Sequence, residues 1–246
     1  MTEAEWMACT DPRPMLEFLQ GKASERKLRL FAVACWRRVW LLIGDERARI
    51  AVEVAERYAD DLATDAEREA ARRACARTLV FWQDKPVQCW RPMQMDRPRI
   101  AQRVFIDCIA AKWETASFAR VGAIVVDGAG QMAACPPGQD YDPVKWQVES
   151  QEQCKLLRDI FGNPFRPVTL DPAVLAWNDS TVVRLAQAAY DERQMPEGLF
   201  DNSRLAVLAD ALEEAGCQDL DILSHCRSGG EDIRGCWVID LLLGKS

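Results

Sequence analysis

Helix start signals recur along this sequence and constrain its fold more than any other feature. Thr2 with Glu5 and Thr64 with Glu67 each form a capping box, in which a hydroxyl and a carboxylate satisfy free backbone amides of the first helical turn. Asp11, followed by a proline, marks another start. Apolar residues after these signals return every three or four positions, and alternating stretches are nearly absent. The sequence therefore predicts an all-α fold, an irregular array of about nine to eleven helices with little or no sheet.

The same periodicity predicts the limits and buried faces of individual helices. The helix at about 45–60 is expected to bury Ile50, Val54 and Tyr58. A final short helix is expected at about 235–243, and the apolar run 238–243 could alternatively form a buried strand. The other expected helices begin at residues 2 and 11 or cover about 24–43, 64–81, 99–125, 143–161, 171–177, 179–193, 202–216 and 219–226.

Two segments rich in proline and glycine interrupt the helical pattern. Residues 83–98 and 126–142 are both predicted to be loops, the second because it contains Gly128, Gly130 and a Pro-Pro pair. The second loop would connect a basic-leaning N-terminal helical region, 1–125, to an acidic C-terminal helical region, 143–246. Residues 22–120 carry 20 basic and 14 acidic side chains, whereas residues 121–246 carry 10 and 20. The two regions are expected to be separate or to pack as one domain.

Long apolar stretches are missing from the sequence. No window of about eighteen apolar residues exists, and the acidic first residues lack the apolar core of a signal peptide. The sequence therefore predicts no membrane partner and a cytoplasmic protein, in which the ten cysteines stay reduced.

The C-terminal segment concentrates side chains that bind metals. Cys217, His225, Cys226 and Cys236 fall within twenty positions, and His225 is the single histidine of the chain. Thiolate and imidazole are the ligands that zinc prefers, and four of them would complete a closed tetrahedral site. However, no Cys-x-x-Cys pair is present, and adjacent helical residues point in different directions. The favoured interpretation places the thiols in the core with His225 bonded to a backbone carbonyl. A zinc-binding module or metal-dependent enzyme at these residues is the alternative.

A complete set of catalytic residues is not recognisable in the sequence. His225 is the one imidazole that could activate a nucleophile, and no nucleophile turn surrounds any cysteine. Gly128-Ala129-Gly130 lacks the third glycine and the helix start of a nucleotide-binding turn. The segment from Lys22 to Trp40 interleaves basic and aromatic side chains, which suits nucleic acid but is more typical of a helix with one core face. We therefore expect a non-catalytic accessory or interaction protein that binds another macromolecule, a protein rather than nucleic acid.

Several segments distributed along the chain form a recognisable set. They are MTEAEW at 1–6, LLRDIFGNPFRP at 156–167, ADALEEAGC at 209–217, HCR at 225–227 and RGCWV at 234–238. Together they resemble a family of uncharacterised bacterial proteins that are often present in several copies per genome. The resemblance spans essentially the full chain and implies no activity.

The chain departs from this family at two positions, and one of its segments resembles a second motif. Cys35-Trp36 stands where relatives often have two cysteines, and Asp232 stands where they often have histidine. If Asp232 replaces a histidine, a metal role for its loop is weakened, although a carboxylate also ligates metals. Separately, Arg204 to Gly216 is similar to the short repeat-companion motif of large bacterial proteins, which implies an interaction or accessory role.

Overall fold

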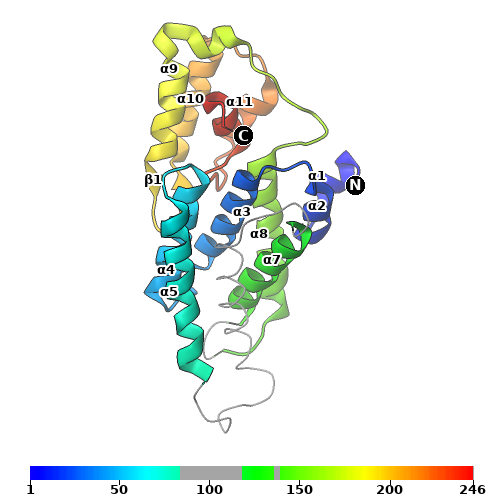
Figure 1. Ribbon diagram of the computed structural model, residues 1–246. Helices are drawn as coiled ribbons and strands as arrows, with labels where there is room; N and C mark the ends of the chain where they lie inside the picture. Colours follow the sequence, from blue (N-terminus) through cyan, green and yellow to red (C-terminus); the bar gives the residue numbers. More distant parts are fainter. Residues whose placement is uncertain (84–117, 136–138, 246) are drawn as a thin grey trace. The chain divides into compact units, whose positions relative to one another are not determined.

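The computed structural model describes residues 1–83, 118–135 and 139–245, and this part of the chain is predominantly helical (Figure 1). Within it lie eleven α-helices, one 3₁₀ turn and a single two-stranded antiparallel sheet, which confirms the all-α prediction. None of the described helices combines the length and apolarity that crossing a bilayer requires. The described residues divide into two compact units, Met1–Lys155 and Leu156–Ser246.

The first unit is built from helices whose starts follow the predicted capping signals. Thr2 and Thr64 both form their capping boxes, and Asp11 and Ser24 accept backbone amides at two further starts. Helix α3 packs against α4, and α4 packs against α5. The elements are α1 (Glu3–Ala8), α2 (Pro12–Leu19), α3 (Glu25–Arg38), the 3₁₀ turn η1 (Trp40–Leu42), α4 (Glu46–Ala59), α5 (Asp65–Gln83), α7 (Phe118–Ala134) and the part of α8 (Pro143–Phe161) up to Lys155. The last turns of α8, from Leu156, belong to the second unit.

The predicted loop at 126–142 is wrong over its first nine residues, because helix α7 continues to Ala134. Gly128 and Gly130 are buried inside this helix. A Cβ atom at Gly130 would lie 3.2 Å from the ring of Trp146 on α8, so the glycine allows close contact between the two helices. That packing outweighs the cost of about 1 kcal/mol for glycine in a helix interior. The predicted loop at 83–98, apart from its first residue at the end of α5, and the predicted helix at 99–125, up to residue 117, fall outside the described residues.

The predicted buried face of α4 is also wrong. Ile50 is 46% exposed, and the buried side chains are small or charged instead, among them Ala51, Val52 and Glu56. Glu56 pairs with Arg37 of α3 at 2.6 Å, with both side chains buried. The helix is therefore rotated so that alanines admit a close neighbour and a carboxylate meets a buried guanidinium.

The basic and aromatic side chains of the segment from Lys22 to Trp40 lie largely in the interior. Arg29 is 2% exposed, Trp36 1% and Arg37 3%. Helix α3 ends at Arg38, earlier than expected, and the chain continues as η1. Arg29, Arg37 and the aromatic side chains therefore belong to the core of the unit, whereas Lys22 is exposed and Arg26, Lys27 and Arg38 are partly exposed.

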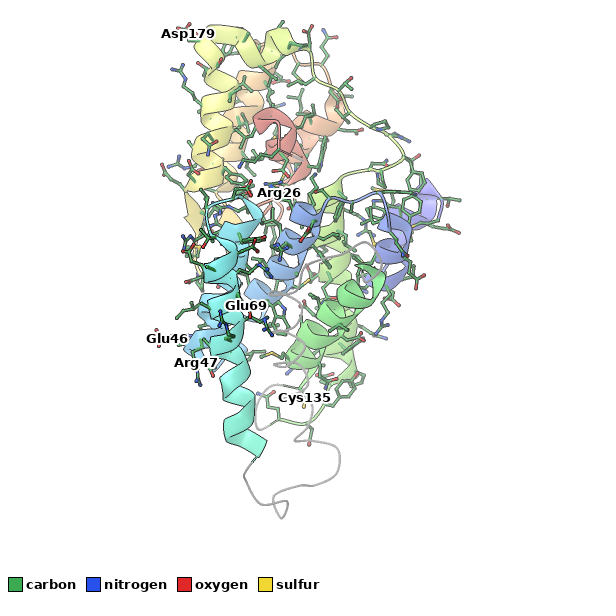
Figure 2. The ribbon with its side chains drawn as sticks, in the orientation of Figure 1. Arg26, Glu46, Arg47, Glu69, Cys135 and Asp179 are labelled. Carbon is green, nitrogen blue, oxygen red and sulfur yellow. The ribbon has the colours of Figure 1, made fainter. Side chains whose placement is uncertain are left out.

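The second unit is a helical array with one short hairpin. Helix α9 packs against α10 and α12, and α10 packs against α11. The residues Trp177 to Ser180 interrupt α9 with non-helical backbone, which accounts for the two helices predicted there; Figure 2 shows Asp179 at this break. The elements are α9 (Pro172–Asp191), β1 (Arg193–Gln194), β2 (Leu199–Phe200), α10 (Asn202–Glu214), α11 (Leu220–Arg227) and α12 (Trp237–Leu243).

In the second unit, the cap of α10 differs from the prediction, and the conformation of residues 238–243 decides between the two alternatives. The cap of α10 is Asp201 rather than the expected Asn202 or Ser203, because its carboxylate accepts the amide of Ser203. The residues 238–243 are helical, so the alternative of a buried strand is excluded.

Candidate metal centre

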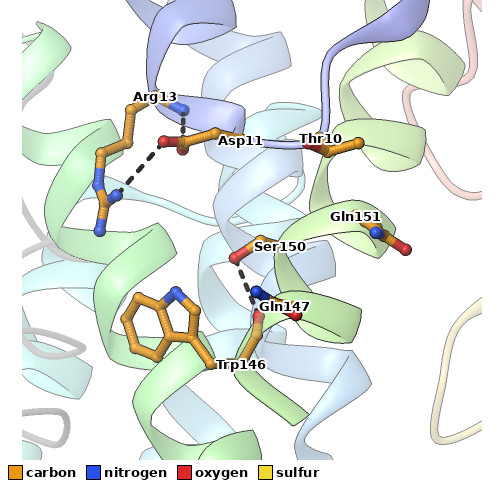
Figure 3. Close-up of a pocket in the computed structure, with 7 residues that line it drawn as sticks. All are labelled: Thr10, Asp11, Arg13, Trp146, Gln147, Ser150 and Gln151. Atoms are coloured by element: carbon orange, nitrogen blue, oxygen red, sulfur yellow. Dashed lines mark hydrogen bonds and ion pairs between the residues drawn. The ribbon is translucent and has the colours of Figure 1, made fainter. Parts of the chain in front are cut away.

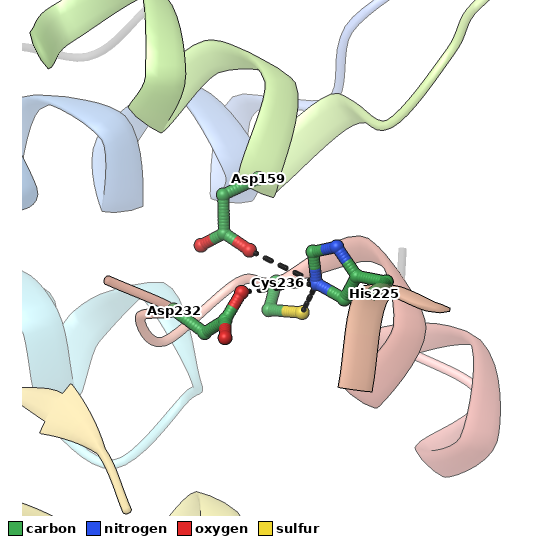
Figure 4. A group of neighbouring side chains, drawn as sticks. All are labelled: Asp159, His225, Asp232 and Cys236. Carbon is green, nitrogen blue, oxygen red and sulfur yellow. Dashed lines mark hydrogen bonds and ion pairs between the residues drawn. The ribbon is translucent and has the colours of Figure 1, made fainter. Parts of the chain in front are cut away.

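Four side chains that bind metals converge within the second unit (Figure 4). Asp159 lies in the last turns of α8, and His225 lies near the end of α11. Asp232 belongs to the loop that precedes α12, and Cys236 is the N-cap residue of that helix. The four residues thus come from four different segments of one unit, and the fold rather than sequence spacing brings them together.

The geometry of the cluster is centred on one ring nitrogen. His225 Nε2 lies 3.0 Å from Cys236 Sγ, 3.1 Å from Asp232 Oδ1 and 3.3 Å from Asp159 Oδ1. All four potential ligand atoms lie within 4.8 Å of one another. An imidazole nitrogen carries at most one hydrogen, so it can donate a linear hydrogen bond to only one of these three groups. Such convergence is typical of ligands that surround a cation.

Burial makes this arrangement costly without a positive charge at its centre. The exposed fractions are 8% for Asp159, 4% for Asp232 and 1% for Cys236. Within the described residues, Asp232 Oδ2 has no hydrogen-bond partner, and Asp159 Oδ1 has only its ion-pair contact with His225 Nε2. An unsatisfied buried carboxylate oxygen destabilises a fold by about 1–3 kcal/mol or more. A bound cation would offset that cost.

Neighbouring groups hold the two carboxylates in place. Asp159 Oδ2 accepts the backbone N–H of Ile233 at 3.0 Å, and the Asp232 carbonyl accepts the N–H of Phe200 at 2.8 Å. The ring of Trp237 lies 5.5 Å from the His225 ring. Partners of this kind orient metal ligands, and their loss typically lowers metal affinity about 10- to 100-fold.

The electrostatics of the cluster follow from burial and from the mutual proximity of its members. Burial, followed by the contact with Asp232, raises the pKa of Asp159 to about 6, although His225 opposes the shift. Burial and the nearby Asp159 carboxylate raise the pKa of Cys236 to about 12. Burial alone would lower the pKa of His225, but Cys236, Asp159 and Asp232 outweigh it and raise that pKa. Burial thus favours the neutral thiol of Cys236, and the neighbouring carboxylates favour the protonated imidazole of His225.

The structure separates the four residues that the sequence singled out. Cys217, Cys226 and Cys236 all lie in the hydrophobic core of this unit, as the favoured interpretation expected, but Cys236 also faces the cluster together with His225. Burial raises the pKa of the Cys226 thiol to about 11, which suits an inert core residue. His225 Nε2 contacts side chains rather than the backbone carbonyl that the sequence suggested.

Asp159 and Asp232 complete the cluster, and sequence reasoning did not propose either as a site residue. Asp232 had one signal, since the chain departs there from histidine in the family that it resembles. Asp159 had none, because it lies in an ordinary helical pattern far from the other three residues. In the described part of the chain, no second group of three or more metal-binding side chains occurs.

A pocket in the first unit is the weaker candidate (Figure 3). Its volume is about 340 Å³, and its lining includes Arg13, Trp146 and Ser150. Its charged groups and the Ser150 hydroxyl are already paired. The Arg13 guanidinium contacts Asp11 at 3.5 Å and Asp127 at 2.6 Å, and the Ser150 hydroxyl donates to the Trp146 carbonyl. The pocket therefore lacks the convergent, unsatisfied groups that mark the cluster around His225.

Searches of protein-family models, of curated proteins and of solved structures returned no match to this chain.

Proposed function

We propose that this chain is a non-catalytic helical protein whose second unit, the C-terminal unit Leu156–Ser246, binds one zinc ion through Asp159, His225, Asp232 and Cys236. The observation that carries the proposal is the approach of a thiol and two carboxylates to the single nitrogen His225 Nε2. With zinc–ligand bonds of about 2.0–2.3 Å, neighbouring ligand atoms of a tetrahedral site lie about 3.3–3.6 Å apart. In this cluster the three ligand atoms nearest to His225 Nε2 lie 3.0–3.3 Å from it, and no two of the four ligand atoms lie more than 4.8 Å apart. The spacing of the four atoms is therefore close to that of a tetrahedral zinc site.

The donor set favours zinc over the common hard cations. Magnesium and calcium are bound by oxygen ligands, whereas this site offers one sulfur and one imidazole nitrogen beside two oxygens. Zinc accepts all three donor types and favours four-coordinate geometry in structural sites. The two carboxylates and the thiolate would bring three negative charges to the dication, so the occupied site would carry a net charge of −1 and the ion would satisfy the orphaned oxygens.

The number of ligands supports a structural rather than a catalytic role. Four protein ligands complete a tetrahedron, and a catalytic zinc keeps one position for water or substrate. A chain without catalysis acts by binding, and we infer that its partner is a protein. Val207 on α10 and Leu220 on α11 support this inference, because their side chains are 54% and 77% exposed. The repeat-companion resemblance of Arg204 to Gly216 falls on the same helix α10.

Metal analysis tests the zinc proposal directly. The purified full chain should contain about one zinc per molecule, and cobalt(II) should replace it with visible bands typical of tetrahedral coordination. Cys236→Ser should abolish the thiolate-to-cobalt charge-transfer band. Cys226→Ser is the matched control, because this buried neighbour lies outside the cluster. Absence of stoichiometric metal, or equal loss of the band in both variants, would overturn the proposal.

The partner proposal has its own test. A partner retained by the wild-type chain should be lost on Val207→Asp or Leu220→Asp, while metal content stays unchanged. Turnover of a substrate by the isolated chain would overturn the non-catalytic assignment.

A further inference from the structure

We propose that metal binding at this centre latches the segment Ser228–Gly235 onto the C-terminal unit, so that the ion controls whether the segment is held or released. This inference rests on the proposed function and assigns a regulatory consequence to the same site. The segment connects α11 to α12. His225 precedes it, Asp232 lies within it and Cys236 follows it, so three of the four ligands fix it near both ends and in its middle.

The segment has little intrinsic order of its own. Its first four residues, Ser228 to Glu231, are all exposed. Gly229 has φ +65, a Cβ atom built on it would meet no atom within 4 Å, and Gly230 is within that distance only of Ser228 and Asp232. Glycine loses more conformational freedom on folding than any other residue, so ordering this stretch is unfavourable unless contacts elsewhere offset the loss.

The segment is attached beside the proposed ligands at Asp232 and Ile233, and Arg234 stacks over the ring of Tyr190 at 4.6 Å. The backbone of Asp232 accepts the N–H of Phe200, and Ile233 forms a bridge with Leu199. The Ile233 N–H donates to Asp159, which is itself a proposed ligand. An ion that fixes Asp159 and Asp232 would therefore also fix two of the residues through which the segment is attached.

Removal of the ion would favour detachment of the segment Ser228–Gly235 from the unit. The Nε2 atom of His225 carries at most one hydrogen, so it can donate to only one of the Asp159 and Asp232 Oδ1 atoms, which lie 3.3 and 3.1 Å away, and the other is left without that hydrogen bond. Asp159 is fixed in helix α8, whereas Asp232 lies in the loop. Asp232 is therefore the carboxylate that can reach water, and its movement would carry the exposed residues Ser228 to Glu231 with it.

Limited proteolysis of the full chain tests the latch, since trypsin sites after Arg227 and Arg234 bracket the segment. Cleavage of a locally opened state follows the population of that state, so zinc at about 100 times its Kd should slow both cuts up to about 100-fold. Cleavage after the exposed Arg184 in α9 serves as an internal control and should change far less. In Asp232→Asn, zinc should leave all three rates unchanged. A short unstructured peptide reports any effect of zinc on trypsin itself.

The outcomes separate the latch from the zinc proposal. If calorimetry shows zinc binding but the cuts after Arg227 and Arg234 keep their rates, the latch is wrong and the zinc centre stands. If zinc protects Arg184 as strongly as the two flanking sites, the ion stabilises the whole unit and the latch is again wrong. If zinc does not bind, both proposals fall.

Discussion

Replacement of Cys236 by serine is the substitution that separates a metal centre from a packed core. The thiol is 1% exposed and lies 3.0 Å from His225 Nε2, so serine preserves the shape of the site and removes its one sulfur ligand. A serine hydroxyl does not ionise near neutral pH and is a poor zinc ligand, whereas a thiolate is a strong one. We therefore expect the variant to fold and to lose most of the stabilisation that zinc gives.

The magnitude follows from mass action. With free zinc at about 100 times the wild-type Kd, binding stabilises the folded unit by about 2.7 kcal/mol. Even loss of a group that only supports a ligand can lower affinity about 100-fold, so loss of a ligand should lower it at least that far. The same zinc concentration then stabilises the variant by about 0.4 kcal/mol. The unit Leu156–Ser246 has the size for which 1 kcal/mol moves the Tm by about 4–8 °C. The expected zinc-induced shifts are about 11–22 °C for wild type and about 2–3 °C for Cys236→Ser.

Differential scanning calorimetry with and without zinc measures these shifts. Each protein is compared with its own metal-free form, so the intrinsic cost of a buried hydroxyl cancels. Cys226→Ser is the matched control: the side chain is 3% exposed, also buried, but it does not face the cluster. It should retain the wild-type zinc shift. The reasoning is refuted if zinc does not move the wild-type transition, or if Cys226→Ser loses the shift while Cys236→Ser retains it.

Two further predictions concern pH and packing around the site. The raised pKa values of Cys236 and His225 mean that zinc must displace a proton from each of them. Two displaced protons predict that the zinc affinity falls about 100-fold from pH 8 to pH 7. Below about pH 6, where Asp159 also binds a proton, the affinity should fall more steeply. Chelator competition measures this slope, and a flat profile would contradict it. Separately, Gly162→Ala should destabilise the unit by about 2–5 kcal/mol in urea unfolding, since φ is +61 and a Cβ would lie 3.0 Å from Trp237. The control Gly244→Ala has a similar φ but no atom within 4 Å, so it should cost only about 1–2 kcal/mol, and equal losses would exclude the contact with Trp237.

The helix starts were predictable because their signals are local. A capping box such as Thr2 with Glu5 satisfies its own backbone amides, so three or four consecutive residues contain the whole argument. Gly128 and Gly130 show the limit of local reasoning. Glycine in a helix interior costs about 1 kcal/mol relative to alanine, and at Gly130 the ring of Trp146 lies so close that a larger residue would be crowded. The reason lies in the packing of α8 against α7, and this packing cannot be read from the residues around Gly130.

The candidate site was predictable only in part, and the reason lies in the geometry of α11. Consecutive residues of a helix point about 100° apart, so His225 and Cys226 cannot both reach one ion. The structure directs Cys226 into the core and His225 toward the cluster. A site that used His225 would therefore have to draw ligands from other segments, and Asp159 and Asp232 are the carboxylates that lie beside it. Because Cys226 points away from the cluster and Cys236 faces it, replacing Cys226 by serine should keep the zinc-induced Tm shift, whereas replacing Cys236 should remove most of it. The two thiols are similarly buried, so burial alone would not distinguish them. Sequence proximity to His225 selects Cys226 as the ligand, whereas the fold selects Cys236, eleven positions away.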